Sequence, residues 1–233
     1  MFRQQYYKIV LSALISLIAI SYGYSQSNET RVIDFGRFNE DDWIKVRDDA
    51  VPAIGSFIQK EGCMMNFVKE EDKNSHALTT GHAMRLLKGV DFLNGRIEAE
   101  IELVGQAAPS IYFRTQTTGD VHQAAYNLVV FDFSSTNNLY YYGLNLWKWK
   151  ETWPPEAKAS KRWLKLGSWA FPVPLNKKFK VALECKGPYI NVFFDGQLKG
   201  SIYDSDPLGK GAVGICSCEG QNLFYNFKVT PFK

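Results

Sequence analysis

The chain has 233 residues, of which 45% are hydrophobic and 22% are charged, and its formal net charge is +3. A chain of this length and apolar content buries a sizeable core, which excludes a mostly disordered protein. The small, evenly spread net charge excludes an extended basic surface for nucleic acid. Aromatic residues make up 15% of the chain, so some of them are candidates for a surface that stacks against flat ligands.

The first 25 residues are predicted to be a signal peptide and not part of the fold. Arg3 and Lys8 give a short basic start, and the apolar run 9–20 that follows contains no charged residue. Such a run is too short for a membrane-spanning helix, which needs about 20 residues. Gly23 and Ser25 are spaced as a signal peptidase site requires, so we expect cleavage after Ser25 and a secreted or periplasmic protein. The alternative is a buried N-terminal helix.

The rest of the chain, residues 26–233, is predicted to be one all-β domain without a membrane span. Apolar and polar residues alternate along most of it, and no helical periodicity, repeat or linker interrupts the pattern. Asp195 and Gly196 supply a tight hairpin turn. About a dozen strands with this aromatic content favour two packed antiparallel sheets. Strands are expected near Val32, Gly55, Cys63 and Ala83, and over 95–103, 110–117, 124–133, 139–150, 178–186, 189–194, 197–203, 211–216 and 223–230.

Several segments carry a distinctive order of motifs. They are N-G-R-I-E-A-E-I at 94–101, S-I-Y-F-R at 110–114, a hairpin over 178–196 that ends in I-N-V-F-F-D-G, and the closing segments 211–215 and 224–229. This order resembles a concanavalin A-like or laminin G-like jelly roll. Within that group it is similar to the exported 3-keto-disaccharide hydrolases and, more distantly, to the family 16 glycoside hydrolases. The resemblance covers nearly all of residues 26–233 and implies a two-sheet antiparallel jelly-roll sandwich.

The resemblance brings no catalytic signature with it. Family 16 hydrolases hold two carboxylates about 5 Å apart, one as nucleophile and one as acid and base. The corresponding segment here, 124–132, contains a single carboxylate, Asp132, and Tyr126 or Asn127 stands where the keto-disaccharide family tends to have an acidic residue. We therefore expect binding without hydrolysis. The alternative is a glycoside-cleaving enzyme, for which His122 and Asp132 are the catalytic candidates.

Three glutamates have the spacing of catalytic carboxylates on a strand, but the spacing is the only similarity. Glu98, Glu100 and Glu102 alternate with apolar residues, so they share one face of a strand. Three carboxylates in a row repel one another unless they are solvated or paired with cations. We expect them to form the solvated outer face of an antiparallel strand.

The aromatic residues are the stronger indication of function. Five of the six tryptophans lie between Trp147 and Trp169. Trp147 and Trp149 share one face of a strand, with Lys148 on the other face, and Trp153 precedes two prolines that stiffen a loop. Indole faces pack against the C–H groups of sugar rings, so we expect a concave, aromatic-lined groove that binds an oligo- or polysaccharide. The alternative is that these rings fill the space between the two sheets.

A polar patch is expected beside these rings. Tyr112 and Arg114 are two residues apart and are predicted to share the face that is concave in the resembling proteins. An arginine fork there binds adjacent hydroxyls or a carboxylate, or else it forms an ion pair with a neighbouring acidic residue. The full set of predicted ligand-binding residues is Tyr112, Arg114, Gln123, Tyr126, Trp147, Trp149 and Trp153.

The cysteines allow two interpretations. Cys63, Cys185, Cys216 and Cys218 all follow the predicted cleavage site, where an oxidising compartment allows disulfides to persist. They are either buried thiols, or one bridge joins Cys185 to Cys216 or Cys218. Their spacing relative to the three histidines does not match a zinc site.

No cofactor is expected, and a Ca²⁺ ion is the alternative. Its oxygen ligands would come from Asp195, Asp204 and Asp206, although aspartates of this kind more often just form turns. The sequence thus predicts an exported carbohydrate-binding protein, with a glycoside hydrolase or a protein-interaction module as alternatives.

Overall fold

A computed structural model of the chain describes residues 29–46, 57–66, 83–104, 108–118, 121–132, 142–150, 163–217 and 221–232. The predicted signal peptide and its cleavage site lie outside these residues, as do Trp153 and Cys218. Within the described part of the chain, no helix is long and apolar enough to cross a membrane.

The described residues are mostly β-strands, as the alternation of apolar and polar residues predicts. In chain order they form β1 (Arg31–Asp34), the 3-10 helices η1 (Phe35–Arg37) and η2 (Glu40–Asp42), β2 (Trp43–Val46), β3 (Phe57–Lys60), β4 (Cys63–Asn66), β5 (Ala83–Leu87), β6 (Gly95–Val104), β7 (Pro109–Thr118), β8 (Val121–Asp132), β9 (Tyr142–Lys150), β10 (Trp163–Trp169), β11 (Phe179–Lys186), β12 (Tyr189–Phe194), β13 (Gln197–Tyr203), β14 (Ala212–Ser217) and β15 (Gln221–Pro231). Only β2 and β10 lie outside the predicted ranges. β2 lacks regular alternation, and a register shift between Lys165 and Gly167 interrupts the pattern of β10.

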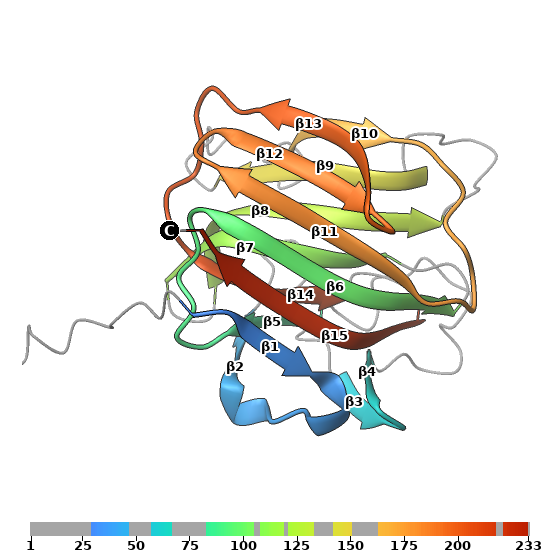
Figure 1. Ribbon diagram of the computed structural model, residues 1–233. Helices are drawn as coiled ribbons and strands as arrows, with labels where there is room; N and C mark the ends of the chain where they lie inside the picture. Colours follow the sequence, from blue (N-terminus) through green and yellow to red (C-terminus); the bar gives the residue numbers. More distant parts are fainter. Residues whose placement is uncertain are drawn as a thin grey trace, which may run out of the picture.

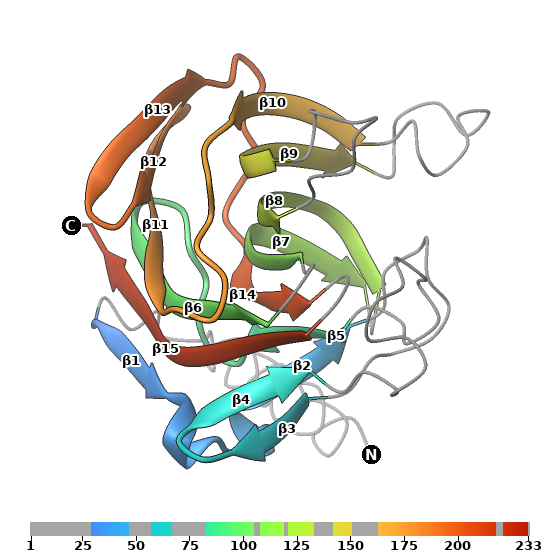
Figure 2. The ribbon, with the colours of Figure 1, turned by 90° about the vertical axis from the view of Figure 1, so that its right-hand side faces the viewer.

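These strands form two sheets that pack face to face (Figures 1 and 2). Sheet A has the order β13-β12-β11-β6-β15-β4-β3, with β1 also beside β15. Sheet B has the order β10-β9-β8-β7-β14-β5-β2. Every pairing between named strands is antiparallel. The predicted all-β, two-sheet antiparallel sandwich is confirmed.

The main core lies between the sheets, and β6 shows why its sequence folds this way. The burial of its residues alternates strictly, so Ile97, Ile101 and their neighbours enter the core. Each such aliphatic side chain contributes about 1.5–3 kcal/mol when it is fully buried. The glutamates between them lie on the outer face of sheet A. Glu98 pairs with Arg96 at 3.1 Å, and Glu102 accepts a hydrogen bond from the Tyr225 hydroxyl at 2.7 Å.

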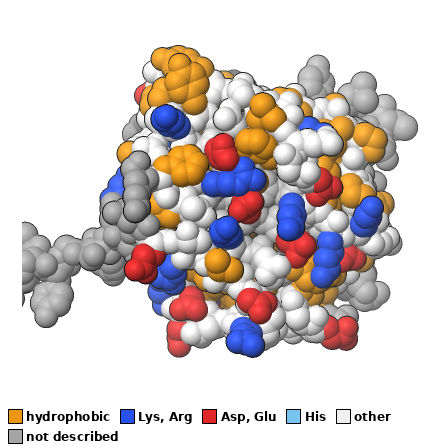
Figure 3. Space-filling model, viewed as in Figure 1, with side chains coloured by type: hydrophobic (Ala, Val, Ile, Leu, Met, Phe, Trp, Pro, Cys, Tyr) orange, Lys and Arg blue, Asp and Glu red, His pale blue; other side chains and the backbone are white. Residues whose placement is uncertain are grey.

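Charge of both signs therefore covers the middle of the outer face of sheet A. In Figure 3, acidic and basic side chains interleave across the middle of this face. Lys228 approaches Glu98 to 3.8 Å, and Arg96 also contacts Glu184 at 2.7 Å. The expectation that the Glu98, Glu100 and Glu102 series is a solvated surface holds, because each carboxylate is partly exposed. Arg96 and Lys228 offset the charge of Glu98, and Glu100 and Glu102 accept hydrogen bonds from neutral side chains.

A second, smaller apolar cluster lies on the opposite side of sheet B, which we call the outer face of sheet B. It contains Val46, Met84, Leu86, Tyr112, Ala125 and Cys216, with Trp163 and Ala212 packed against it. Cys185, by contrast, is in the core between the sheets. The proposed Cys185–Cys216 bridge is wrong, because the two thiols lie on different faces and no disulfide joins them. The interpretation as buried thiols holds for Cys63, Cys185 and Cys216.

Candidate functional site

Cross-strand pairing places aromatic and polar side chains in one row on the outer face of sheet B. Lys165 of β10 opposes Trp147 of β9, and Trp147 opposes Asn127 of β8. Asn127 in turn opposes Tyr112 of β7. Directly opposed side chains in a sheet have Cβ atoms about 4.5–5.5 Å apart, so the row is continuous. The adjacent row contains Ser168, Asn145, Val129 and Ser110.

Two asparagines on this face have hydrogen-bonding atoms that the described residues leave unpaired. Asn145 is fully buried, and its Oδ1 accepts a hydrogen bond from the Ser168 hydroxyl at 2.7 Å. Among the described residues, neither Asn145 Nδ2 nor Asn127 Oδ1 has a partner. A buried polar atom without a partner costs about 1–3 kcal/mol. The unpaired atoms make the two asparagines candidates for a functional role.

The tryptophans of β9 lie on the same face as these amides. Trp147 is half-buried, and the Lys165 ammonium lies 4.7 Å from the centre of its ring. Trp149 is buried, with its ring centre 6.3 Å from that of Trp163. The alternative that these rings fill the space between the sheets is wrong for Trp147 and Trp149. It holds for Trp169, which packs against the main core.

Lys148 points to the other side of β9, as predicted, and joins a buried ionic network. Its Nζ donates to Asp204 Oδ2 at 2.8 Å, and the Tyr126 hydroxyl donates to the same oxygen at 2.5 Å. Burial pushes the pKa of Asp204 up. The hydrogen bonds from Lys148 and Tyr126, a third from the backbone of Asp206 and the Lys148 charge outweigh that effect and hold the pKa below its usual value. Burial, reinforced by the bond to Asp204, raises the pKa of Tyr126.

The prediction that Arg114 shares a face with Tyr112 is wrong, because a β-bulge lies between them. Two residues of β7, Arg114 and Thr115, stand opposite one position of β8, and Arg114 has a φ of 47°. The bulge turns the guanidinium into the protein, where it is fully buried. Arg114 donates to the carbonyl oxygens of Leu93, Gly187 and Leu208 at 2.7–3.3 Å. The guanidinium therefore joins three loops.

The predicted polar patch of Tyr112 and Arg114 consequently does not form. Tyr112 stays on the outer face of sheet B, whereas Arg114 and Tyr126 are buried on the side that faces sheet A. Gln123 is half-buried and lines a small pocket of about 310 Å³ beside Gln116 and Lys150. Its predicted role in binding stays a prediction.

The two catalytic candidates lie in β8. His122 pairs with Thr117 and Asp132 with Tyr142 through the backbone, while the side chains of both candidates lie outside the described residues.

The aspartates considered for Ca²⁺ have protein partners. Asp206 forms an ion pair with Lys150 at 2.5 Å, and Asp204 is held by Lys148. Asp195 Oδ1 accepts a hydrogen bond from the backbone N–H of Lys180 at 2.8 Å. In the described ranges, no three His, Cys, Asp or Glu side chains are grouped closely enough to hold a metal ion. The Ca²⁺ alternative for these residues stays a prediction.

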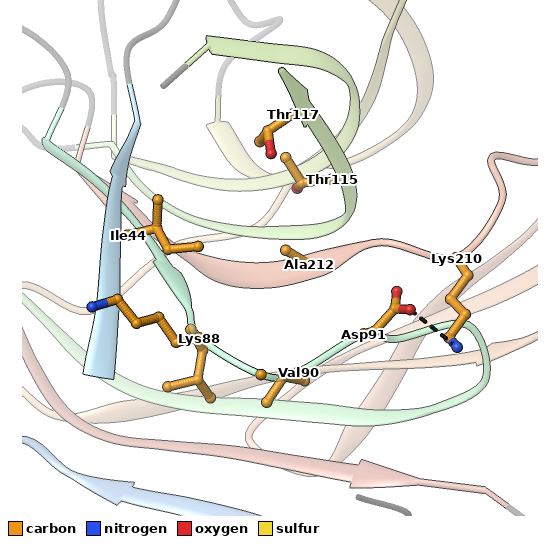
Figure 4. A pocket seen from close by; sticks show the side chains of 10 residues that line it. Ile44, Lys88, Val90, Asp91, Thr115, Thr117, Lys210 and Ala212 are labelled. Atoms are coloured by element: carbon orange, nitrogen blue, oxygen red, sulfur yellow. Dashed lines mark ion pairs between the residues drawn. The ribbon is translucent and has the colours of Figure 1, made fainter. Parts of the chain in front are cut away.

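A larger hollow, which we call the edge pocket, lies at one end of the outer face of sheet B (Figure 4). It has a volume of about 740 Å³. Ile44, Thr115, Thr117 and Ala212 line it from the strands, and residues 88–91 and Lys210 line it from two loops. The sequence alone gives no indication of this pocket. Strict alternation along β7 would place Thr115 on the side that faces sheet A, because the sequence pattern does not reveal the bulge at Arg114.

Comparison with known proteins defines the fold. No family model and no curated protein matches the sequence. A carbohydrate-binding module, CBM66 from Bacillus subtilis, is 16% identical with a TM-score of 0.58, over 81% of this chain and 95% of the module. A native glycosidic hydrolase is 14% identical with a TM-score of 0.59, over 90% of this chain and 99% of the hydrolase. A Bacillus licheniformis β-glucanase is 12% identical with a TM-score of 0.57, over 89% of this chain and 100% of the glucanase. The chain has a concanavalin A-like jelly-roll fold.

The jelly roll confirms the fold that the sequence resemblance implies. At these low identities the likeness concerns the fold alone, so the function is argued from the residues of this chain.

Proposed function

We propose that this jelly roll is an exported protein that binds an oligo- or polysaccharide on the outer face of sheet B. The observation that carries the proposal is the position of Trp147. Its half-buried ring lies on the same face as the two asparagines whose side chains have unpaired atoms. A sugar ring packs its C–H groups against an indole while its hydroxyls bond to nearby amides. The apolar run 9–20 supports export.

The chemistry of this face favours binding over cleavage. Retaining glycosidases need two carboxylates about 5 Å apart. On β8, the described outer-face side chains are Ala125, Asn127 and Val129, none of which is acidic. The amide of Asn127 both donates and accepts hydrogen bonds, which suits sugar hydroxyls. Solved structures with this fold include a module named for carbohydrate binding and a β-glucanase, which supports carbohydrate as the ligand class.

A glycan array tests the proposal, with Trp147→Ala as the variant and Phe193→Ala as its matched control. Both rings are half-buried, and each has a cation above it, Lys165 on Trp147 and Arg96 on Phe193 at 4.8 Å. Phe193, however, lies on the outer face of sheet A. We expect the wild type to bind a defined group of glycans, Trp147→Ala to lose at least tenfold in affinity, and Phe193→Ala to bind normally. Equal losses in both variants would contradict the proposal.

A glycoside-cleaving enzyme is the second candidate, because the solved structures with this fold include a glycosidic hydrolase. Release of reducing ends from the glycans found on the array distinguishes the two functions. We expect no release by the wild type. Turnover that disappears in His122→Ala or Asp132→Ala would instead identify an enzyme. If no glycan binds and none is cleaved, the protein-interaction module becomes the favoured interpretation.

A further inference from the structure

The edge pocket has a rigid, preformed frame. The backbone N–H of Lys88 donates to the carbonyl of Asp42 at 2.8 Å, which fixes the loop after β5 to the start of β2. Phe92 and Gly211 exchange two backbone hydrogen bonds of 2.7 and 3.1 Å, which fix the same loop to the start of β14. The pocket volume of about 740 Å³ is within the range of small-molecule sites, about 300–1,000 Å³.

The lining of the edge pocket is apolar on one side and polar on the other. Ile44, Val90 and Ala212 contribute aliphatic surface, and the Thr115 and Thr117 side chains lie across the hollow from Ile44 and Val90 (Figure 4). Asp91 and Lys210 form an ion pair of 3.0 Å at one end. Because these two charges neutralise each other, the pair offers hydrogen-bond acceptors and donors with little preference for a charged ligand.

Thr115 provides the observation that indicates a ligand. Its side chain is 2% exposed and lines the pocket, yet among the described residues its hydroxyl has no hydrogen-bond partner. The bulge at Arg114 is what places it there, because the extra residue moves Thr115 onto the outer face of sheet B. A buried hydroxyl without a partner costs about 1–3 kcal/mol, a cost that a ligand hydroxyl removes.

We infer that the edge pocket is a second binding site, which holds a single pyranose unit. The aliphatic side contacts the C–H face of the sugar, and Thr115 and the Asp91–Lys210 pair bond to its hydroxyls. The choice of a sugar rests on the proposed function, whereas the existence of a site rests on Thr115 and the pocket itself. β7 lies two strands from β9, or about 10 Å across the sheet. A longer glycan held at Trp147 would therefore extend toward this pocket.

The test uses methyl pyranosides of D-glucose, D-galactose and D-mannose as probes, titrated into the full chain by ligand-observed NMR. We expect at least one of them to bind and Thr115→Val to weaken that binding about tenfold, the equivalent of about 1.4 kcal/mol. Thr115→Val keeps the shape of the side chain and replaces the hydroxyl with a methyl group. Its melting temperature should equal or exceed that of the wild type, because an unpaired buried hydroxyl is lost. Thr230→Val, in sheet A, is the matched control and should bind normally.

Three results would overturn the inference. The first is that none of the three glycosides binds. The second is that Thr115→Val binds as well as the wild type. The third is that Thr115→Val melts several degrees lower, which would mean that its hydroxyl has a partner within the fold.

Trp147→Ala separates this inference from the proposed function. Methyl glycoside binding that survives Trp147→Ala and is lost in Thr115→Val supports the edge pocket, whatever the glycan array shows. The reverse pattern overturns the pocket and leaves the proposed function standing.

Discussion

At the scale of single residues, the buried pair of Lys148 and Asp204 links the two layers of the molecule. Lys148 comes from β9 of sheet B, and Asp204 follows β13 of sheet A. Both side chains are almost completely buried, and Tyr126 adds a hydrogen bond to the same carboxylate. Desolvation of such a pair costs about as much as its attraction returns, so the pair fixes the position of the loop after β13 more than it stabilises the fold.

Removing one partner of this pair should lower the free energy of unfolding by much more than the intact pair contributes to it. Lys148→Met leaves Asp204 buried without a countercharge, so we expect the free energy of unfolding to fall by about 3–5 kcal/mol. Lys150→Met is the control, because its partner Asp206 is exposed, and we expect a loss of no more than about 1 kcal/mol. Urea unfolding measures both changes. Similar losses in the two variants would contradict the account of this network.

Asp204 should also contribute to unfolding in acid. Its pKa in the folded protein lies below the usual carboxyl value of about 3.9, so the unfolded chain binds its proton more readily. The contribution of Asp204 to the free energy of unfolding is therefore complete when the pH is above the usual carboxyl pKa. It is lost as the pH falls through the lowered pKa of the folded protein. We expect Asp204→Asn to be less stable at neutral pH and to lose less stability than the wild type between pH 4 and pH 2. Parallel stability curves would show that Asp204 has an ordinary pKa.

At the scale of elements, the bulge in β7 decides which side chains reach which face. Arg114 adopts a positive φ, a conformation that glycine or asparagine usually takes. Its hydrogen bonds to three carbonyls compensate for that strain, and they exist only after the loops at Leu93, Gly187 and Leu208 have come together.

This bulge also shows where prediction from the sequence ends. The strands themselves follow from alternation, a local property, and so does the shared face of Trp147 and Trp149. The position of Arg114 depends on contacts between loops that are distant in the chain, which no local pattern encodes. Asparagine is uncommon within strands, so Asn127 and Asn145 could have been recognised as functional candidates from the sequence. Lys165 could not, because its place beside Trp147 depends on a strand with broken alternation.

Arg114→Met tests the structural role of the bulge. The change removes the donor of the buried Leu208 carbonyl and of the partly buried Leu93 and Gly187 carbonyls, at about 1–3 kcal/mol for a buried group, so we expect the free energy of unfolding to fall by about 3 kcal/mol. Arg96→Met is the control, since its partners Glu98 and Glu184 are partly exposed, and we expect a change below about 1 kcal/mol. Thermal or urea unfolding gives both values. A loss for Arg114→Met no larger than that for Arg96→Met would contradict the assignment.

At the scale of the whole molecule, the two sheets present different outer faces. Interleaved charges cover the middle of the outer face of sheet A, where neighbouring side chains satisfy one another (Figure 3). The outer face of sheet B carries tryptophans, amides and an apolar cluster instead, and the edge pocket lies at its end. A neutral ligand with hydroxyls and C–H faces gains more from the second surface than from the first.

The central claim is that the ligand binds to sheet B and not to sheet A. Hydrogen–deuterium exchange of the wild-type chain, with and without the tightest-binding glycan from the array, tests it strand by strand. The account predicts slower exchange on binding in β8, β9 and β10, with β11, β12 and β13 unchanged. Slower exchange confined to β11, β12 and β13, or no glycan that alters exchange in either sheet, would contradict it.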